Sequence, residues 1–321
     1  MKARNTQKIK FIVLLNIVFF ASAGFLLSQS DLGNYDENKP LTIVGETSMP
    51  PFFEGKQPNV IQDTANNLSA FFEKLMSLQN ITTVEKPVVR IVHIGDSHVR
   101  SHEFTPVLNL RLSEVFGCAA STFIEGYRSS GIVEESGEHG IICHCIGING
   151  ATSKNFLDDK YISEISSLKP DLLIISLGTN ESIGRYNSDT HYTMMESLLY
   201  SLKKECPDAA VLYTTPPGAF KPIYNKAKKR RYRRIISFED NKNTQNVAET
   251  IKQFAVAHDA ACWDLFNIVG GNENACKNWL AGNFYKHDRL HFLVEGYALQ
   301  GDLLYESLIE SYNNYVLSRN E

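Results

Sequence analysis

The fold is decided by the stretch Val88-Val89-Arg90-Ile91-Val92-His93-Ile94-Gly95-Asp96-Ser97-His98. Its first seven residues are apolar and mostly β-branched apart from one arginine and one histidine, which predicts a buried strand. A serine follows the abrupt end of this strand, after a glycine that permits a tight turn. In open α/β sheets, ligands lie beyond the carboxyl ends of the strands. The stretch therefore predicts that Ser97 presents a hydroxyl nucleophile at such a sheet edge.

The chain from this point onward alternates strand-like runs with amphipathic helical patterns. The predicted strands cover residues 88–94, 141–146, 171–177, 210–214 and 260–264. The predicted helices cover residues 105–116, 153–168, 190–205, 244–258 and 294–317. Continuous apolar runs such as Leu172-Leu173-Ile174-Ile175 are typical of strands that helices cover on both faces. The alternation predicts an α/β protein with three α/β/α layers and a mostly parallel, five-stranded sheet.

The N-terminal region differs from the rest of the chain. Four basic residues within positions 2–10 precede an apolar stretch at residues 11–27. This order is typical of an export signal, and Ala21-Ser22-Ala23 offers a cleavage site of small residues. The stretch is also within the lower range of lengths that span a bilayer. Residues 1–27 are therefore predicted to be a signal peptide or an uncleaved membrane anchor, with the remaining chain in the periplasm or cell envelope.

The next segments are expected to lead into a single large domain. Residues 28–58 are polar and contain four prolines, which predicts a linker or a loosely docked arm. Residues 60–76 show apolar positions three and four apart, which predicts a helix packed on the outside of the main domain. Residues 59–321 are long enough to bury a complete core in one domain.

Charge and cysteine content favour neither a nucleic acid partner nor a metal site. The formal net charge of −4 over 321 residues creates no global field that attracts nucleic acid. The six cysteines are even in number, but their spacing fixes no disulfide pairing. Cys143-His144-Cys145 resembles half a metal site, yet no second pair stands at zinc-type spacing. In a strand the two cysteines share one face and the histidine takes the other, so ordinary packing is the preferred interpretation. We expect no metal and no cofactor.

Three later segments supply the groups that a serine nucleophile needs. Ester hydrolysis requires a base, a group that orients the base, and donors for the oxyanion. We expect His291 to act as the base and Asp288, three residues earlier, to fix its tautomer. The expected oxyanion donors are the backbone amides of Ser97 and Gly150 and the side-chain amide of Asn180.

Each of these segments alone has an ordinary explanation as a turn or a loop. Together, in order and at predicted strand ends, they favour a catalytic interpretation. The chain contains no Gly-x-Ser-x-Gly elbow, which argues against the ordinary α/β-hydrolase version of this chemistry.

At this point the sequence resembles a known family. The segments Gly95-Asp96-Ser97-His98, Gly147-Ile148-Asn149-Gly150, Gly178-Thr179-Asn180-Glu181 and Asp288-Arg289-Leu290-His291 are similar to the four blocks of the SGNH (GDSL) hydrolases. The resemblance extends over about residues 68–308 and implies a flavodoxin-like SGNH hydrolase fold without a cofactor. It implies that Ser97 is the nucleophile and that Gly150 and Asn180 belong to the oxyanion hole. It also implies that Asp288 and His291 complete the catalytic triad with Ser97.

A narrower resemblance concerns the substrate. His98 stands where leucine is common in the name-giving motif. This motif and five further segments together resemble the bacterial branch that includes peptidoglycan O-acetylesterases. The segments are residues 148–152, 177–181, 213–217, 288–292 and 296–301. This resemblance implies an exported esterase that removes acetyl groups from the 6-hydroxyl of N-acetylmuramic acid in cell-wall polysaccharide. Two alternatives stay open: an O-acetyltransferase that uses the same acyl-serine, and a non-catalytic envelope-binding protein with the same fold.

Several other polar residues have a structural interpretation beside a functional one. His98 adjoins the candidate nucleophile and is expected to line the substrate pocket in a positioning role. His93 is expected to be a packed, hydrogen-bonded core histidine. Glu181 either orients the Asn180 amide or merely begins a loop. The basic run at residues 226–234 faces an anionic glycan or a membrane surface, or forms a solvated face, and the solvated face is preferred.

Overall fold

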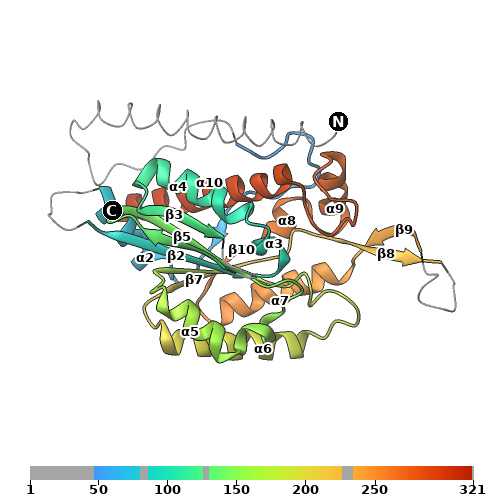
Figure 1. Ribbon diagram of the computed structural model, residues 1–321. Coiled ribbons are helices and arrows are strands. Elements are labelled where there is room, and N and C mark those ends of the chain that lie inside the picture. Colours follow the sequence, from blue (N-terminus) through green and yellow to red (C-terminus); the bar gives the residue numbers. More distant parts are fainter. Residues whose placement is uncertain (1–46, 80–85, 126–129, 226–233, 320–321) are drawn as a thin grey trace, which may run out of the picture. The chain divides into compact units, whose positions relative to one another are not determined.

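The computed structural model describes residues 47–79, 86–125, 130–225 and 234–319 (Figure 1). The fold presented below belongs to the compact unit Pro40–Glu321. The predicted signal peptide or anchor at residues 1–27 lies outside the described residues, as does most of the predicted arm. No helix in the described ranges is long and apolar enough to cross a membrane.

Within the described residues, an eight-stranded sheet forms the middle layer, in the order β1-β10-β7-β6-β2-β5-β4-β3. The strands are β1 (Ile61–Gln62), β2 (Val88–Gly95), β3 (Ala120–Glu125), β4 (Ser130–Glu135), β5 (Gly140–Gly147), β6 (Leu172–Ser176), β7 (Ala210–Thr214) and β10 (Ala261–Trp263). Strands β10, β7, β6, β2 and β5 run parallel, and they are the five that the sequence predicts. Strands β1, β4 and β3 extend the two edges in antiparallel pairing, which the sequence analysis did not predict.

The parallel strands have a flavodoxin-like order. Among these parallel strands β2 comes first in the chain, yet it lies between β5 and β6. The direction of winding reverses between β2 and β6, and ligands of such sheets bind beyond the carboxyl ends at this point. Gly95, the last residue of β2, pairs with Gly147 of β5 and with Ser176 of β6. The three strands therefore end on one row at the reversal point.

Helices cover both faces of the sheet (Figure 1). They are α2 (Ser69–Gln79), α3 (Ser97–Arg100), α4 (Phe104–Phe116), η1 (Ser153–Leu157), α5 (Asp159–Ser167), α6 (Ser188–Glu205), α7 (Asn243–Ala257), α8 (Leu265–Ile268), α9 (Gly271–Ala281) and α10 (Val294–Ser318). Ile91 of β2 packs into a cluster with α2, α4 and α10, whereas Val92 packs into a second cluster with α5, α6 and α7. This alternation confirms the predicted α/β/α layers, because neighbouring strand residues point to opposite faces.

The helix predicted over residues 60–76 is wrong in its first half. Helix α2 begins only at Ser69, and β1 precedes it and pairs with β10. The Asp63 carboxylate accepts hydrogen bonds from the backbone amides of Asn67 and Leu68, at 2.8 and 2.9 Å. Such a side-chain-to-backbone turn competes with helix, so the chain bends here before the helix starts.

A separate hairpin extends from the sheet and was not predicted (Figure 1). It pairs β8 (Phe220–Tyr224) with β9 (Ile235–Asp240) in antiparallel fashion. Its side chains are exposed or half-buried, so neither strand shows the buried face that makes a strand recognisable in sequence. The basic run predicted at residues 226–234 falls between the two strands, and all of it except Arg234 lies outside the described residues.

The described part of the predicted arm, residues 47–58, packs against the domain. The Phe53 ring is 3% exposed and meets the Trp279 ring edge-on, with centroids 5.3 Å apart. The backbone amide of Glu54 donates to the Asn278 side chain at 3.0 Å, and the Asn278 amide donates back to the Glu54 carbonyl at 2.8 Å. The hydrophobic core thus includes part of this segment.

This packing gives a stability prediction. Phe53→Ala should lower the free energy of unfolding by about 3 kcal/mol, because it removes a buried ring and leaves a cavity. Urea unfolding followed by circular dichroism measures the change. Phe52→Ala is the matched control, since Phe52 is 50% exposed. Equal losses in the two variants would show that the segment does not contribute to the core.

Candidate active site

The structure brings Ser97, His291 and Asp288 into one hydrogen-bonded chain. Ser97 Oγ lies 2.8 Å from His291 Nε2, although 194 positions separate the two residues in sequence. His291 Nδ1 lies 2.7 Å from Asp288 Oδ2. In this arrangement Nε2 can accept the serine proton while the Nδ1–H group donates to the carboxylate. The geometry is that of an activated serine hydroxyl.

Ser97 lies at the junction of β2 and α3. A Cβ atom at Gly95 would lie 2.6 Å from the carbonyl oxygen of Ser176 in β6, so only glycine fits where the two strands end. The Asp96 side chain caps α3 by accepting the backbone amide of His98 at 2.9 Å. The first amides of a helix have no acceptor within the helix, which leaves the Ser97 amide available to a ligand.

Asp288 and His291 lie in a loop that two buried aromatic residues anchor. Tyr285 and Phe292 form an antiparallel bridge at its base, with ring centroids 4.6 Å apart. Asp288 Oδ1 accepts the backbone amides of Leu290 and His291 at 3.0 and 2.9 Å. Burial alone would raise the pKa of Asp288, but the hydrogen bonds from His291 and the backbone outweigh it and lower that pKa. The carboxylate therefore stays ionised beside the imidazole at neutral pH.

The predicted oxyanion donors reach the same sheet edge. The Asn180 side-chain amide donates to the Asp96 carboxylate and to the carbonyl of Ala151, both at 3.0 Å. Gly150 has a φ of +74°, a conformation that favours glycine. Its amide has no backbone acceptor among the described residues. These contacts hold Asn180 next to Asp96, which precedes Ser97, and next to Ala151, which follows Gly150. An oxyanion would compete for the hydrogens of the Asn180 side-chain amide with the Asp96 carboxylate oxygen and the Ala151 carbonyl oxygen.

Glu181 ties two of these loops to each other. Its carboxylate accepts the backbone amide of Ser153, which follows β5, at 2.9 Å, and the amide of Gly178, which follows β6, at 3.0 Å. Burial raises the pKa of Glu181, and the hydrogen bonds it accepts lower it only in part. Its hydrogen bonds join the loops that contain Gly150 and Asn180, a role that differs from both interpretations left open by the sequence.

His98 lies behind the candidate base and is 6% exposed. Its Nδ1 atom is 3.2 Å from the Tyr297 hydroxyl, and its ring centroid is 5.5 Å from that of His291. Burial, and secondly the charge of His291, lower the pKa of His98 to about 3, so the ring is neutral at physiological pH. His98 therefore packs among protein side chains, among them Tyr297 and the candidate base His291.

His93 is a packed core histidine, as predicted. It is fully buried in β2, with Nδ1 2.9 Å from the Thr105 hydroxyl and Nε2 2.7 Å from the Ser176 hydroxyl. Burial lowers the pKa of His93 to about 3. A neutral ring held on both sides supports the end of β2 and takes no part in the hydrogen-bonded chain of Ser97.

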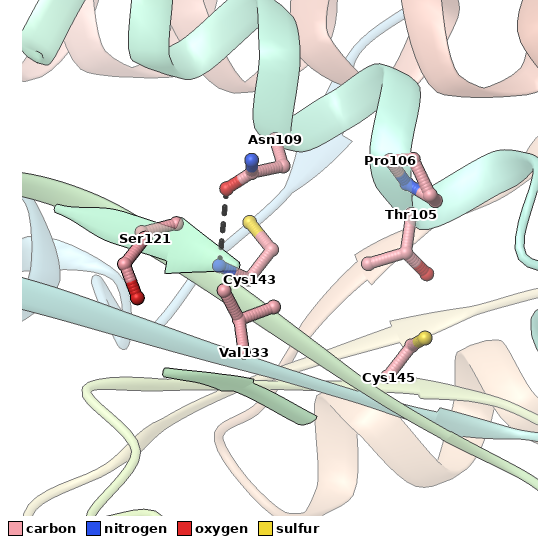
Figure 2. Close-up of a pocket in the computed structure, with 8 residues that line it drawn as sticks. Thr105, Pro106, Asn109, Ser121, Val133, Cys143 and Cys145 are labelled. Atoms are coloured by element: carbon pink, nitrogen blue, oxygen red, sulfur yellow. Dashed lines mark hydrogen bonds between the residues drawn. The ribbon is translucent and has the colours of Figure 1, made fainter. Parts of the chain in front are cut away.

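Two cavities lie near these elements. The larger, of about 380 Å³, adjoins the loop of Asp288 and the β8–β9 hairpin. The smaller, of about 120 Å³, lies between α4 and the β5 side of the sheet (Figure 2). It is lined by Thr105, Pro106, Asn109, Ala120, Ser121, Val133, Cys143 and Cys145. The smaller cavity contains none of the candidate catalytic residues.

The smaller cavity also shows how the cysteines of β5 are placed. Cys143 and Cys145 both line it, which confirms that they share one face of the strand (Figure 2). His144 accepts the Val133 backbone amide at 3.2 Å. The thiols of all six cysteines are free. In the part of the chain that the structure describes, no three histidine, cysteine or acidic side chains gather as metal ligands.

The family follows from a sequence match over more than half of the chain. The profile of the GDSL-like lipase/acylhydrolase family matches residues 129–299. The chain belongs to this family. The matched region contains Gly150, Asn180 and the Asp288–His291 loop, and Ser97 precedes it. As a member of an acylhydrolase family, the chain is a hydrolytic esterase of the SGNH type.

Solved structures resemble this chain at low sequence identity. A peptidoglycan O-acetylesterase superposes with a TM-score of 0.65 at 18% identity, over 79% of this chain and 99% of that one. An acetyl xylan esterase gives a TM-score of 0.46 at 15% identity, over 68% and 100% of the two chains. A psychrotrophic esterase from Pseudoalteromonas sp. gives 0.45 at 15% identity, over 70% and 99%. No curated protein sequence matches this chain. The first of these likenesses supports the fold and says nothing of the substrate.

Asp96 gives a pH-dependent prediction. Burial raises its pKa from 3.8 to about 7, and the neighbouring Glu181 adds to this, against the hydrogen bonds from His98 and Asn180. A raised pKa means that its contribution to stability is full below about pH 4 and is lost as the pH rises through about 7. Asp96→Asn removes this titration. The free energy of unfolding of the variant, minus that of the wild type, should therefore rise by on the order of a few kcal/mol when the pH is raised from about 4 to about 8. Urea unfolding at the two pH values measures the difference.

Asp288→Asn is the control for this experiment. The lowered pKa of Asp288 acts in the opposite sense, so the stability of this variant relative to the wild type should not improve as the pH rises from about 4 to about 8. The absence of an improvement for Asp96→Asn would show that burial does not destabilise the ionised Asp96 carboxyl.

Proposed function

We propose that this chain is an exported serine esterase that removes O-acetyl groups from peptidoglycan through an acetyl-Ser97 intermediate. The observation that carries the proposal is the hydrogen-bonded chain from Ser97 Oγ through His291 to Asp288. It lies at the winding reversal of the sheet, where ligands of such folds bind. A hydroxyl paired with an oriented imidazole is the arrangement that acyl transfer requires.

The proposed cycle has two halves. His291 Nε2 takes the proton of Ser97 as Oγ attacks the acetyl carbonyl carbon, and Asp288 stabilises the imidazolium that forms. The amides of Ser97 and Gly150 and the side chain of Asn180 donate to the developing oxyanion. His291 then protonates the sugar oxygen as its bond to the acetyl carbon breaks. Water, deprotonated by His291, attacks acetyl-Ser97 and releases acetate and the free serine.

Two observations support acetylated peptidoglycan as the substrate, in a fold that a solved peptidoglycan O-acetylesterase shares over 99% of its length. His98 and the neighbouring blocks resemble the branch that includes peptidoglycan O-acetylesterases. The basic and apolar residues at positions 1–27 have the order of an export signal or anchor, which would bring the domain to the cell wall.

The substrate proposal is tested by acetate release. The full chain should release acetate from purified O-acetylated peptidoglycan with a kcat/KM at least about 10-fold above that on acetylated xylan, the range that a fitted pocket supplies. Ser97→Ala should lower kcat by about 10⁴-fold or more on both substrates, because the nucleophile is lost. Coupled enzymatic assay of free acetate measures both.

Two results would contradict the proposal. Faster release from xylan would move the substrate to another acetylated polysaccharide. Appearance of the acetyl group on an added glycan, with little free acetate, would identify the chain as an O-acetyltransferase.

A further inference from the structure

One face of β8 lines the larger cavity beside the dyad loop. Phe220, Pro222 and Tyr224 are spaced two apart and all three line it. Alternate residues of a strand share a face, so the hairpin turns three apolar side chains toward the loop, and Lys221 between them also lines the cavity. Tyr224 is 50% exposed, so this residue is not fully covered by the rest of the described chain.

Strand β9 adds Ile235 and Phe238 to the same surface, although they are three positions apart. The pairing of the two strands shifts by one residue beside Tyr224, which leaves Ile236 as an extra residue in β9. Ile236 is 65% exposed and does not line the cavity. The irregularity thus brings two apolar side chains to the cavity and leaves their neighbour outside it.

The opposite wall of the cavity belongs to the active-site loops. Asp288 and Leu290 come from the dyad loop, and Ile183 and Gly184 come from the loop that contains Asn180. The cavity therefore begins at the two segments that hold the base and a candidate oxyanion donor. A ligand in it would lie beside an ester bound at the serine.

Arg289 fixes the hairpin to the dyad loop. Its guanidinium carbon lies 4.7 Å from the centroid of the Phe238 ring and 5.4 Å from that of Phe220. Its carbonyl accepts the Phe220 backbone amide at 3.0 Å. Its φ of +52° is unusual for a residue other than glycine. These contacts hold the cavity wall at a constant position relative to Asp288.

The lining has the chemistry of a sugar site. Tyr224 and the aliphatic side chains of the lining offer apolar surface to the C–H faces of a pyranose, and the polar side chains of the lining offer hydrogen-bonding groups to its hydroxyls. Lys221 pairs with Glu239 at 2.8 Å and Lys242 with Asp240 at 4.0 Å, so these cations are partly neutralised. The volume of about 380 Å³ is within the range of small-ligand sites. A long acyl chain would require a continuously apolar wall, which the lysines and asparagines interrupt.

We propose that this cavity binds a sugar unit of the glycan next to the acetylated one. The inference rests on the proposed function, because it assumes a polysaccharide ester as the substrate. It assigns the β8–β9 hairpin to substrate selection. A sugar bound in this cavity would leave the proposed reaction at Ser97 the same.

The test compares two substrates across matched variants. The substrates are O-acetylated peptidoglycan fragments and 4-nitrophenyl acetate, which has no glycan. Tyr224→Ala and Ile235→Ser should each lower the ratio of kcat/KM on the glycan to kcat/KM on the small ester by about 10-fold, mainly through KM, because an apolar contact to the sugar is lost. Ile236→Ser is the control on the same strand and should keep the wild-type ratio.

Each other outcome overturns the inference in a distinguishable way. An unchanged ratio in all three variants would show that the cavity is not used. A selective loss on 4-nitrophenyl octanoate relative to the acetate would assign the cavity to the acyl chain. A wild-type chain that hydrolyses 4-nitrophenyl acetate but releases no acetate from the glycan would overturn the proposed function itself, and this inference with it.

Discussion

The site depends on the register of three parallel strands. Gly95 of β2 pairs with Gly147 on one side and with Ser176 on the other, so the strands end on one row. Ser97, Gly150 and Asn180 each follow one of these ends within a few residues. Their convergence is therefore a consequence of backbone pairing in a sheet buried on both faces, where a slip of one residue would expose a whole apolar face. The close approach at Gly95 leaves no room for a side chain and keeps this end of the sheet intact.

Two buried carboxyl groups then fix the loops that leave this row. Asp96 joins the turn of the nucleophile to the Asn180 amide, and Glu181 joins the loops after β5 and β6. The base arrives from the far end of the chain on a loop anchored by Tyr285 and Phe292. Arg289 connects this loop to the β8–β9 hairpin, because its guanidinium lies over the Phe238 ring. The same loop thereby orients the base and forms a wall of the cavity to which we assign the glycan.

The sequence is informative wherever burial imposes a pattern. The five parallel strands are predictable because both of their faces are covered. The candidate site residues stand out because Ser97, Gly150 and Asn180 follow strand ends, while Asp288 and His291 lie in the last loop before the C-terminal helix. The hairpin is missed because its side chains are largely exposed. Strand β1 is missed because the apolar spacing around Ile61 imitates a helix, while the turn at Asp63 depends on side-chain hydrogen bonds. The tying role of Glu181 and the stacking of Arg289 depend on loop conformations that no local pattern encodes.

The central claim is that Ser97 forms the covalent intermediate. Incubation of the full chain with a fluorophosphonate, followed by proteolysis and mass spectrometry, locates the side chain that attacks. The account predicts one adduct, on Ser97, and a much slower reaction in His291→Ala because the hydroxyl has lost its base. An adduct on another side chain, or ester hydrolysis by a chain whose Ser97 stays unmodified, would contradict the account.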